Sequence, residues 1–200
     1  MTTPRSARTP GQPAIDSSND VPPPLDYSFR CLTQMDDILD EDPRTGQRPL
    51  KKTGEGKVVS SALKVNNNAI QDLNGFADIM SKLLDKPEEV SWVDLSFNDI
   101  TKIDDIILQY EGLKMLYLHG NCIADLSEID KLGKLPNLMS LSLHGNPIEN
   151  EKGYRKYVLA KVPQLRTLDF SGVTKCDRAD AATWNKMYGG KKQKKKKKKE

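Results

Sequence analysis

The chain has little cysteine, little histidine and no long apolar run. Cys31, Cys122 and Cys176 are odd in number and share no spacing typical of metal ligands, so we expect neither a disulfide framework nor a zinc site. No segment approaches about 18 apolar residues in a row, and Arg5 and Arg8 are not followed by an apolar stretch. We therefore expect no membrane span, no secretion and a reducing compartment.

Catalytic patterns are also missing. Catalysis needs a nucleophile with a base, or two carboxylates of separated pKa, converging in one pocket, and no such set is indicated. The tetrapeptide GEGK at 54–57 is not a phosphate loop, because Lys51 and Val58 stand where that motif needs glycine and Ser or Thr. We predict no enzyme and no cofactor, and interpret GEGK as a flexible linker.

Charge is distributed unevenly along the 200 residues. The net charge is +3, but residues 191–200 contain eight lysines and one glutamate, so the rest of the chain carries −4. The composition, with 36 % apolar residues, fits one domain with tails. We expect residues 1–24, rich in Pro, Ser and Thr, and the polylysine tail 189–200 to be disordered.

One phrase occurs twice, as LKMLYLHGNCI at 113–123 and LMSLSLHGNPI at 138–148. Its template, L-x-x-L-x-L-x-x-N-x-I, recurs around Asn98 and, in degenerate form, around Asn68, and the asparagines are 30, 23 and 25 residues apart. A last copy has Leu165, Leu168, Phe170 and Val173, without the asparagine. This period is typical of a leucine-rich repeat with about five units.

Alternation along a strand places Leu116 and Leu118 in the core, with Met115, Tyr117 and His119 on the opposite face. After each strand the chain turns, and a side-chain amide can both donate to and accept from the backbone there. We therefore assign a structural role to Asn68, Asn98, Asn121 and Asn146. The predicted fold is an α/β solenoid, with a curved parallel sheet on the concave face and helices on the convex face.

Both ends of the solenoid need helical caps. In the segment 25–57, Leu32, Met35, Ile38 and Leu39 predict an amphipathic helix that is either a lid over the first repeat or a docking segment. The repeat domain, 58–188, contains convex helices, including ones from Phe76 and from Glu151. Thr174 and Asp177 predict a capped closing helix, whose apolar residues would cover the last leucines. These residues are Ala181, Trp184 and Met187 or Tyr188.

The concave face is the candidate protein-binding surface. Trp92, Met115 and Tyr117 should form one aromatic and apolar cluster there, and aromatic anchors are typical hot spots. Alternatively, flanking segments bury this cluster. The remaining predicted contact residues are Asp94, His119 and His144, the last two being imidazoles expected on the exposed sheet. Since no third ligand is placed beside them, we predict no metal site.

Particular stretches resemble a known family. PPPLDYSFR (22–30), DPRTGQRPLK (42–51), LSLHGNPIENEKGYRKYVL (141–159) and DFSGVTKCDRADAATW (169–184) are similar to the leucine-rich repeat-containing protein 51 family. YRKYVLAKVPQLRTLDFSGV also resembles the cap of repeats found in nuclear phosphatase-binding proteins and the spliceosomal A-prime protein.

The first resemblance implies a small non-enzymatic protein of the ciliary or flagellar axoneme, a monomer within a larger assembly of axonemal proteins in the cytoplasm. Arg44, Thr45 and Arg48 either contact a partner or pin the lid to the solenoid. The lysine tail lies outside this resemblance, and its charge would attract acidic tubulin tails, nucleic acid or an import receptor, or would only aid solubility. The acidic body disfavours nucleic-acid recognition. The alternative is a nuclear or cytosolic regulatory adaptor of the splicing or phosphatase type.

Overall fold

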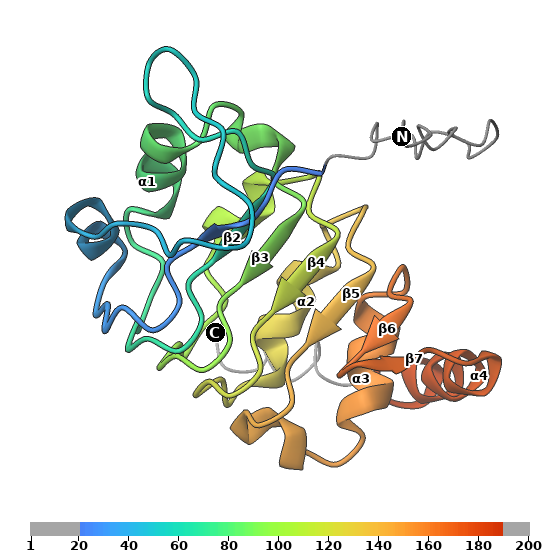
Figure 1. Ribbon diagram of the computed structural model, residues 1–200. Helices are drawn as coiled ribbons and strands as arrows, with labels where there is room; N and C mark the ends of the chain where they lie inside the picture. The colour runs from blue at the N-terminus through green and yellow to red at the C-terminus, as the bar shows by residue number, and fades with distance from the viewer. Residues whose placement is uncertain (1–20, 190–200) are drawn as a thin grey trace, which may run out of the picture.

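A single seven-stranded sheet runs through the computed structural model, which describes residues 21–189 (Figure 1). Its strands lie side by side in chain order, parallel from β1 to β6, and only β7 is antiparallel to its neighbour. They are β1 (Leu25–Asp26), β2 (Ala62–Lys64), β3 (Trp92–Asp94), β4 (Met115–Tyr117), β5 (Ser140–Ser142), β6 (Thr167–Leu168) and β7 (Ser171–Gly172). Each repeat adds one strand to the last, which is the predicted α/β leucine-rich repeat solenoid.

The asparagines join each repeat to the one before it. The Asn121 carboxamide accepts from the backbone N–H of Ile100 and donates to the carbonyls of Leu95 and Leu118, at 2.9 to 3.0 Å. Asn98 and Asn146 make the same three bonds one repeat earlier and later. All three side chains are buried, so each amide satisfies backbone groups that water cannot reach.

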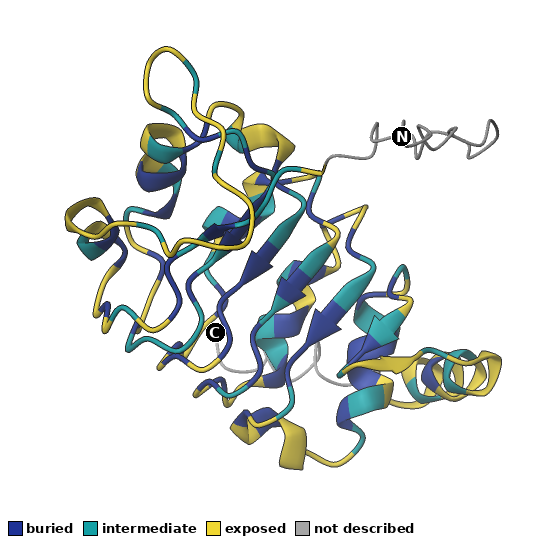
Figure 2. Cartoon of the chain, in the orientation of Figure 1, coloured by how far each residue is buried: buried dark blue, intermediate teal, exposed yellow. Residues whose placement is uncertain are grey.

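The core lies between the sheet and the convex segments. Template leucines such as Leu113, Leu116 and Leu118 are at most 2 % exposed, and each contributes about 2 kcal/mol by its burial. In Figure 2 the buried positions form a continuous layer from the first repeat to the last. One unit could not bury this surface alone, so stability is shared between neighbouring repeats.

Helices and single 3₁₀ turns cover the convex face, with α2 lying behind the sheet in Figure 1. They are α1 (Phe76–Leu83), η2 (Pro87–Glu89), η3 (Asp105–Gln109), η4 (Leu126–Glu128), α2 (Ile129–Leu132), η5 (Pro147–Asn150) and α3 (Tyr154–Lys161). The helix at Phe76 is as predicted. The helix expected from Glu151 begins only at Tyr154, because Gly153 at its N-cap has a φ of 83° that no helix continues through.

The N-terminal segment is built as a further repeat, which the template search missed. Leu25 pairs with Leu63 in the sheet, and the Asn68 carboxamide accepts from the N–H groups of Arg30 and Leu32. The signal was present: LDYSF at 25–29 matches VDLSF at 93–97. In both copies the aspartate accepts hydrogen bonds from the N–H and hydroxyl of the serine two residues later.

The predicted N-terminal amphipathic helix is a 3₁₀ helix, η1 (Met35–Asp40). Its Met35 and Ile38, with Leu32 before it, are buried in the main core, whereas Leu39 is 45 % exposed and was wrongly placed on the apolar face. A 3₁₀ helix has three residues per turn, so positions 32, 35 and 38 align on one side and 39 does not. The segment therefore covers the open end of the first repeats.

The sequence GEGK belongs to a defined turn and not to a flexible linker. Lys52 and Val58 form an antiparallel bridge, and the Thr53 N–H donates to the Lys57 carbonyl at 2.8 Å. Gly56 has a φ of 84°, which this turn requires.

Of the two expected disordered tails, residues 1–20 and 190–200 lie outside the described part. Residues 21–24 lead into β1, and the Pro23 carbonyl accepts from the Ser60 hydroxyl.

The C-terminal cap is helix α4 (Lys175–Trp184), with the predicted capping box between Thr174 and Asp177. Arg155 on α3 donates to both oxygens of Asp177 and lowers the pKa of that carboxyl, so the cap is joined to the last repeat. Ala181 is buried and Trp184 packs on the core as expected. Met187 and Tyr188 do not cover the leucines: they lie on a π-helical turn, η6 (Asn185–Gly189), 59 % and 50 % exposed.

Within residues 21–189 no helix has the length and apolar character that a membrane crossing requires. In the same part of the chain, no three His, Cys, Asp or Glu side chains are grouped as metal ligands.

Asn121→Ala should lower the free energy of unfolding by about 3 kcal/mol, because it leaves buried backbone groups of two repeats without partners. Urea unfolding followed by circular dichroism measures this change. The control is Asn137→Ala, where the side chain is exposed and donates one bond to the Glu111 carbonyl, so the expected loss is below about 1 kcal/mol. Equal losses would contradict the assigned role of the amide.

Candidate protein-binding surface

The register of the sheet brings the predicted contact residues together. Trp92 on β3 pairs with Met115 on β4, and Asp94 pairs with Tyr117. The Trp92 and Tyr117 rings meet edge to face at 6.0 Å, and the Tyr117 hydroxyl lies 4.0 Å from the Met115 sulfur. All three side chains are partly exposed, so this cluster belongs to the concave surface.

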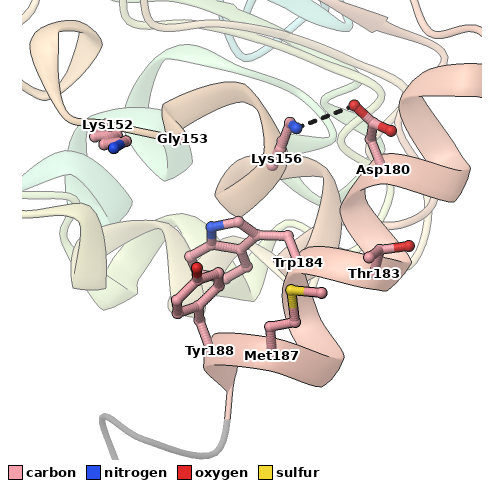
Figure 3. A pocket seen from close by; sticks show the side chains of 8 residues that line it. All are labelled: Lys152, Gly153, Lys156, Asp180, Thr183, Trp184, Met187 and Tyr188. Atoms are coloured by element: carbon pink, nitrogen blue, oxygen red, sulfur yellow. Dashed lines mark ion pairs between the residues drawn. The ribbon is translucent and has the colours of Figure 1, made fainter.

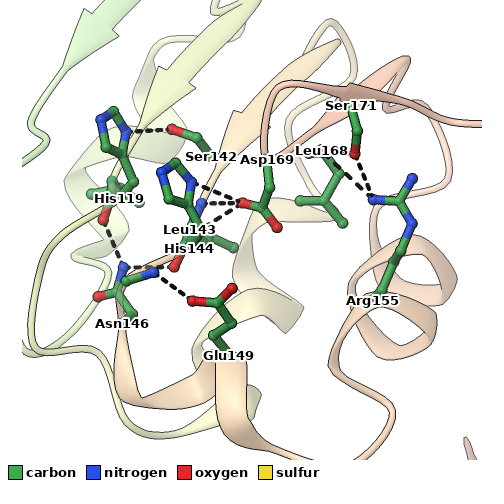
Figure 4. A network of polar contacts seen from close by, with 12 residues as sticks. His119, Ser142, Leu143, His144, Asn146, Glu149, Arg155, Leu168, Asp169 and Ser171 are labelled. Carbon is green, nitrogen blue, oxygen red and sulfur yellow. Dashed lines mark hydrogen bonds and ion pairs between the residues drawn. The ribbon is translucent and has the colours of Figure 1, made fainter.

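The two histidines form a stacked pair beside this cluster. Their ring centroids are 4.7 Å apart and the planes differ by 8° (Figure 4). Nδ1 of His119 is 2.8 Å from the Ser142 hydroxyl, and Nδ1 of His144 is 3.6 Å from an Asp169 oxygen. The expectation of two exposed imidazoles is wrong for His119, which is only 9 % exposed.

Two phenylalanines that were not among the predicted contact residues cover His119. Phe97, which follows β3, meets the His119 ring edge to face at 5.0 Å. Phe170, which follows β6, lies 5.4 Å from both Tyr117 and His119 and 5.5 Å from His144, and so reaches β4 across β5. They are 52 % and 61 % exposed. We call Trp92, Met115, Phe97, Tyr117, His119, His144 and Phe170 the aromatic surface.

Phe170 corrects a prediction, since the template placed it in the core. Asp169 and Phe170 have φ values of 51° and 57°, which reverse the chain into the antiparallel strand β7. The reversal rotates the Phe170 side chain out of the core and onto the concave face. An Asp169 oxygen accepts from the N–H groups of Leu143 and His144 and so joins this reversal to the preceding repeat.

Phe97 and Phe170 share an unfavourable backbone conformation. The turn after the strand has a positive φ at one fixed position, which is occupied by Asn67, Gly120 and Gly145 in three repeats and by Phe29 and Phe97 in two others, whereas Phe170 lies at the reversal into β7. Phe97 adopts it with a φ of 52° and Phe170 with 57°, although it costs a bulky residue about 1–2 kcal/mol. Strain of this kind clusters at functional sites. For Phe97 the sequence signal was an aromatic residue where three other repeats have Asn67, Gly120 and Gly145. For Phe170 no such signal existed, because Gly172 stands at that position of its unit.

Small residues in the neighbouring repeat accommodate the Phe97 ring. A Cβ on Gly120 would lie 2.6 Å from a Phe97 ring carbon, so the ring lies directly across this glycine. Gly145 in turn packs on the Gly120 backbone, where a Cβ would stand 3.2 Å from the Gly120 nitrogen. The two glycines therefore open the space that Phe97 occupies above the turns.

Asp94 does not fit its predicted role as an exposed contact. It is 8 % exposed, and one carboxylate oxygen accepts from the Ser96 N–H at 3.1 Å and from the Ser96 hydroxyl at 2.6 Å. It shapes the turn after β3, and acts on the aromatic surface only through its charge.

Arg44 lies against the first strand. Its N–H donates to the Asp26 carbonyl at 2.7 Å, and its guanidinium donates to the Ser28 carbonyl and stands 5.5 Å from the Phe29 ring centroid. Of the two interpretations, these contacts favour the one in which Arg44 attaches its segment to the solenoid. Thr45 and Arg48 are both exposed.

The family of the chain follows from comparison with known proteins. A family described as "Leucine-rich repeat" matches residues 60–199. Leucine-rich repeat-containing protein 51 of Macaca mulatta is 53 % identical over 165 residues, which are 82 % of this chain and 86 % of that protein. The chain belongs to the leucine-rich repeat-containing protein 51 family. The resemblance inferred from the sequence is thereby confirmed.

More distant similarity concerns a spliceosomal protein. U2 small nuclear ribonucleoprotein A' of Homo sapiens is 33 % identical over 132 residues, 66 % of this chain and 48 % of that protein. The crystal structure of the Drosophila melanogaster SNF/U2A' complex matches with a TM-score of 0.55 and 21 % identity, covering 75 % of this chain and 94 % of that one. This match shows the shared fold. Members of the family are thus repeat modules of the kind that bind proteins. Leucine-rich repeat proteins are generally interaction modules and not enzymes.

Replacing Phe97 tests whether its backbone is strained. Phe97→Asn should keep stability or raise it by up to about 1 kcal/mol, because Asn adopts positive φ readily and does so at position 67. Phe97→Val, in which a β-branched residue must adopt the same φ, should be less stable than Phe97→Asn by about 1 kcal/mol. Urea midpoints compare the two. Equal stability of the Val and Asn variants would contradict strain at this turn.

Lowering the pH should also destabilise the folded chain, because of His119. Its pKa is lowered, first by burial and then by the charge of His144, so the unfolded chain binds protons at a pH where folded His119 stays neutral. The free energy of unfolding should therefore decrease from about pH 7.5 to about pH 5.5, where carboxylates remain ionised. Urea unfolding at both values measures this decrease. His119→Gln should remove most of it, and an unchanged decrease would assign it elsewhere.

Proposed function

We propose that this chain is a non-enzymatic scaffold that holds another protein on the aromatic surface. The observation that supports it best is the pair of exposed phenylalanines, Phe97 and Phe170, kept at positive φ over a cluster of four further rings. Large aromatic side chains at the centre of a concave surface are typical binding hot spots.

The charge around the aromatic surface favours a basic partner segment. Asp94 and Asp169 come from opposite ends of this surface, and the charge of each partly offsets the lowering of the His119 pKa. Carboxylates next to exposed ring faces attract guanidinium and ammonium groups, which gain cation–π contacts with the same rings. We therefore propose that the bound segment presents Arg or Lys beside an apolar anchor.

The proposed location is the axoneme of a cilium or flagellum, with larger axonemal proteins as partners. The support is the resemblance of the whole repeat region to the leucine-rich repeat-containing protein 51 family, which implied such a role. The run of lysines at 191–199 adds a segment that acidic tubulin tails would attract. In this assembly the chain is a monomer that joins other components.

A second candidate is a regulatory adaptor of the nucleus or cytosol. The 33 % identity to human U2 small nuclear ribonucleoprotein A' favours it, and the lysine run would then act as an import signal. The two proposals predict different compartments for the same binding surface, so location separates them.

Fractionating ciliated cells into nucleus, cytosol, detergent-soluble ciliary matrix and salt-washed axonemes tests the first proposal. We expect the endogenous protein on washed axonemes. A tagged Trp92→Ala/Tyr117→Ala variant is then expressed in cells that lack the endogenous copy. The amount retained on washed axonemes should be about tenfold lower than for the unmodified chain, because two central anchors are removed.

The matched control is Leu39→Ala, which removes an exposed apolar side chain at the far N-terminal end. It should be retained like the unmodified chain. Nuclear signal without axonemal signal would exclude the axonemal proposal and favour the adaptor. Unchanged retention of the Trp92/Tyr117 variant, with reduced thermal stability, would show that the cluster is packing and not a binding surface.

A further inference from the structure

The segments LDYSF at 25–29 and VDLSF at 93–97 are two copies of one local structure. In each copy an aspartate accepts from the N–H and hydroxyl of the serine two residues later, and a phenylalanine follows that serine. Phe29 has a φ of 58° and Phe97 a φ of 52°, and both side chains are more than half exposed. The two rings therefore occupy equivalent places in their repeats.

In the first copy, the ring and the carboxylate each have a cation from the chain itself. The Arg44 guanidinium stands 5.5 Å from the Phe29 ring centroid and donates to the Ser28 carbonyl. The Lys64 ammonium lies 3.2 Å from an Asp26 oxygen. Positive charge thus covers both the aromatic and the acidic group of this copy.

In the second copy, neither group has a cation. Within residues 21–189 no Lys or Arg side chain lies over the Phe97 ring or pairs with the Asp94 carboxylate. Lys64 is the cross-strand neighbour of Asp94, but its ammonium is bound to Asp26. The Phe97 ring contacts His119 and is still 52 % exposed. The second copy has the ring and the carboxylate of the first without the two cations.

We propose that an arginine of the partner occupies this second copy, with its guanidinium over the Phe97 ring as Arg44 lies over Phe29. The inference rests on the function proposed above, in which a basic segment binds the aromatic surface, and it names the residue of that segment and its site. The charge of Asp94 attracts the guanidinium, and the exposed ring receives one of its flat faces.

Lys161 and Lys156 show what an ammonium near an aromatic ring needs. The Lys161 ammonium lies 5.6 Å from the ring centroid of a tyrosine in the same helix, and Asp130 pairs with it at 3.3 Å. Lys156 lines a hollow of the C-terminal cap together with Trp184, and it pairs with Asp180 at 3.1 Å (Figure 3). In both places a carboxylate replaces part of the water that a strongly hydrated ammonium loses.

The site at Phe97 offers no such carboxylate, so it favours arginine over lysine. Asp94 is 8 % exposed, and one of its oxygens already accepts two hydrogen bonds from Ser96. It acts on a ligand mainly through its charge. A guanidinium is weakly hydrated and lays a flat face on a ring while the N–H groups at its edges stay in water.

The test uses the full chain and the Nα-acetyl methylamides of arginine, lysine and citrulline, the last having the shape of arginine without its charge. Each is titrated at constant ionic strength while NMR follows the rings of Phe97 and Phe29 and the amide of Gly120, which lies against Phe97. The arginine probe should shift Phe97 and Gly120 with a dissociation constant at least about threefold below that of the lysine probe. Citrulline should give no saturable shift.

The first copy provides an internal control. The Phe29 resonances should not respond in the unmodified chain, because Arg44 already lies over that ring. In Arg44→Ala the ring is uncovered, so Phe29 should then respond to the arginine probe as Phe97 does. Arg44 is exposed, and its backbone bond to Asp26 does not depend on the side chain.

Two variants locate the site. Phe97→Asn, which should fold at least as stably as the unmodified chain, should abolish the response of the Gly120 amide. Asp94→Asn can keep both bonds to Ser96 and should weaken the arginine probe about twofold to threefold, because the charge is removed. Asp105→Asn makes the same change of charge at an exposed convex position and should have no effect.

Three results would overturn the proposal. They are the absence of a saturable shift with the arginine probe, equal dissociation constants for the arginine and lysine probes, and an unchanged Gly120 response in Phe97→Asn.

Retention on washed axonemes separates this inference from the function on which it rests. Phe97→Asn should be retained about tenfold less than the unmodified chain, like the Trp92/Tyr117 variant. Loss in the Trp92/Tyr117 variant with full retention of Phe97→Asn would exclude the arginine site and leave the scaffold proposal standing. Full retention of both would exclude the proposed function and this inference with it.

Discussion

The hydrogen bonds of the buried asparagine amides are the constraint on which the rest of the structure depends. Each amide binds carbonyls of its own turn and of the preceding repeat, so it sets both the turn and the distance between repeats. Strand register follows from this, and register aligns Trp92 with Met115 and Asp94 with Tyr117. The position of the candidate binding surface is thus a consequence of a backbone requirement inside the core.

The same turns that need the amide also need a positive φ, and the chain meets that need in two ways. Gly120, Gly145 and Asn67 adopt it at little cost, while Phe29 and Phe97 adopt it under strain. The Phe97 ring lies across Gly120, where a side chain would clash with it. The aromatic surface therefore forms where a phenylalanine turn and a glycine turn are neighbours. The rings at these turns serve different contacts: Phe29 packs against Arg44, whereas Phe97 packs on His119 in the aromatic surface.

Charge separates the two ends of the molecule. The concave surface combines rings with the carboxylates of Asp94 and Asp169, whereas at the C-terminal end Trp184 and Tyr188 lie with Lys152 and Lys156. This arrangement suits a scaffold, whose task is to connect other proteins.

The sequence by itself determined the repeat, the parallel sheet, the asparagine ladder and the rows on the concave face, because periodicity states which side chains enter the core. It did not show that LDYSF opens a further repeat, since the asparagine that marks a unit is absent there and Asn68 of the next unit acts for it. Tertiary structure alone decided the burial of His119, the turn of Phe170 onto the concave face and the exposure of Met187. These three depend on contacts between residues distant in the chain, or on a backbone reversal that no local pattern encodes.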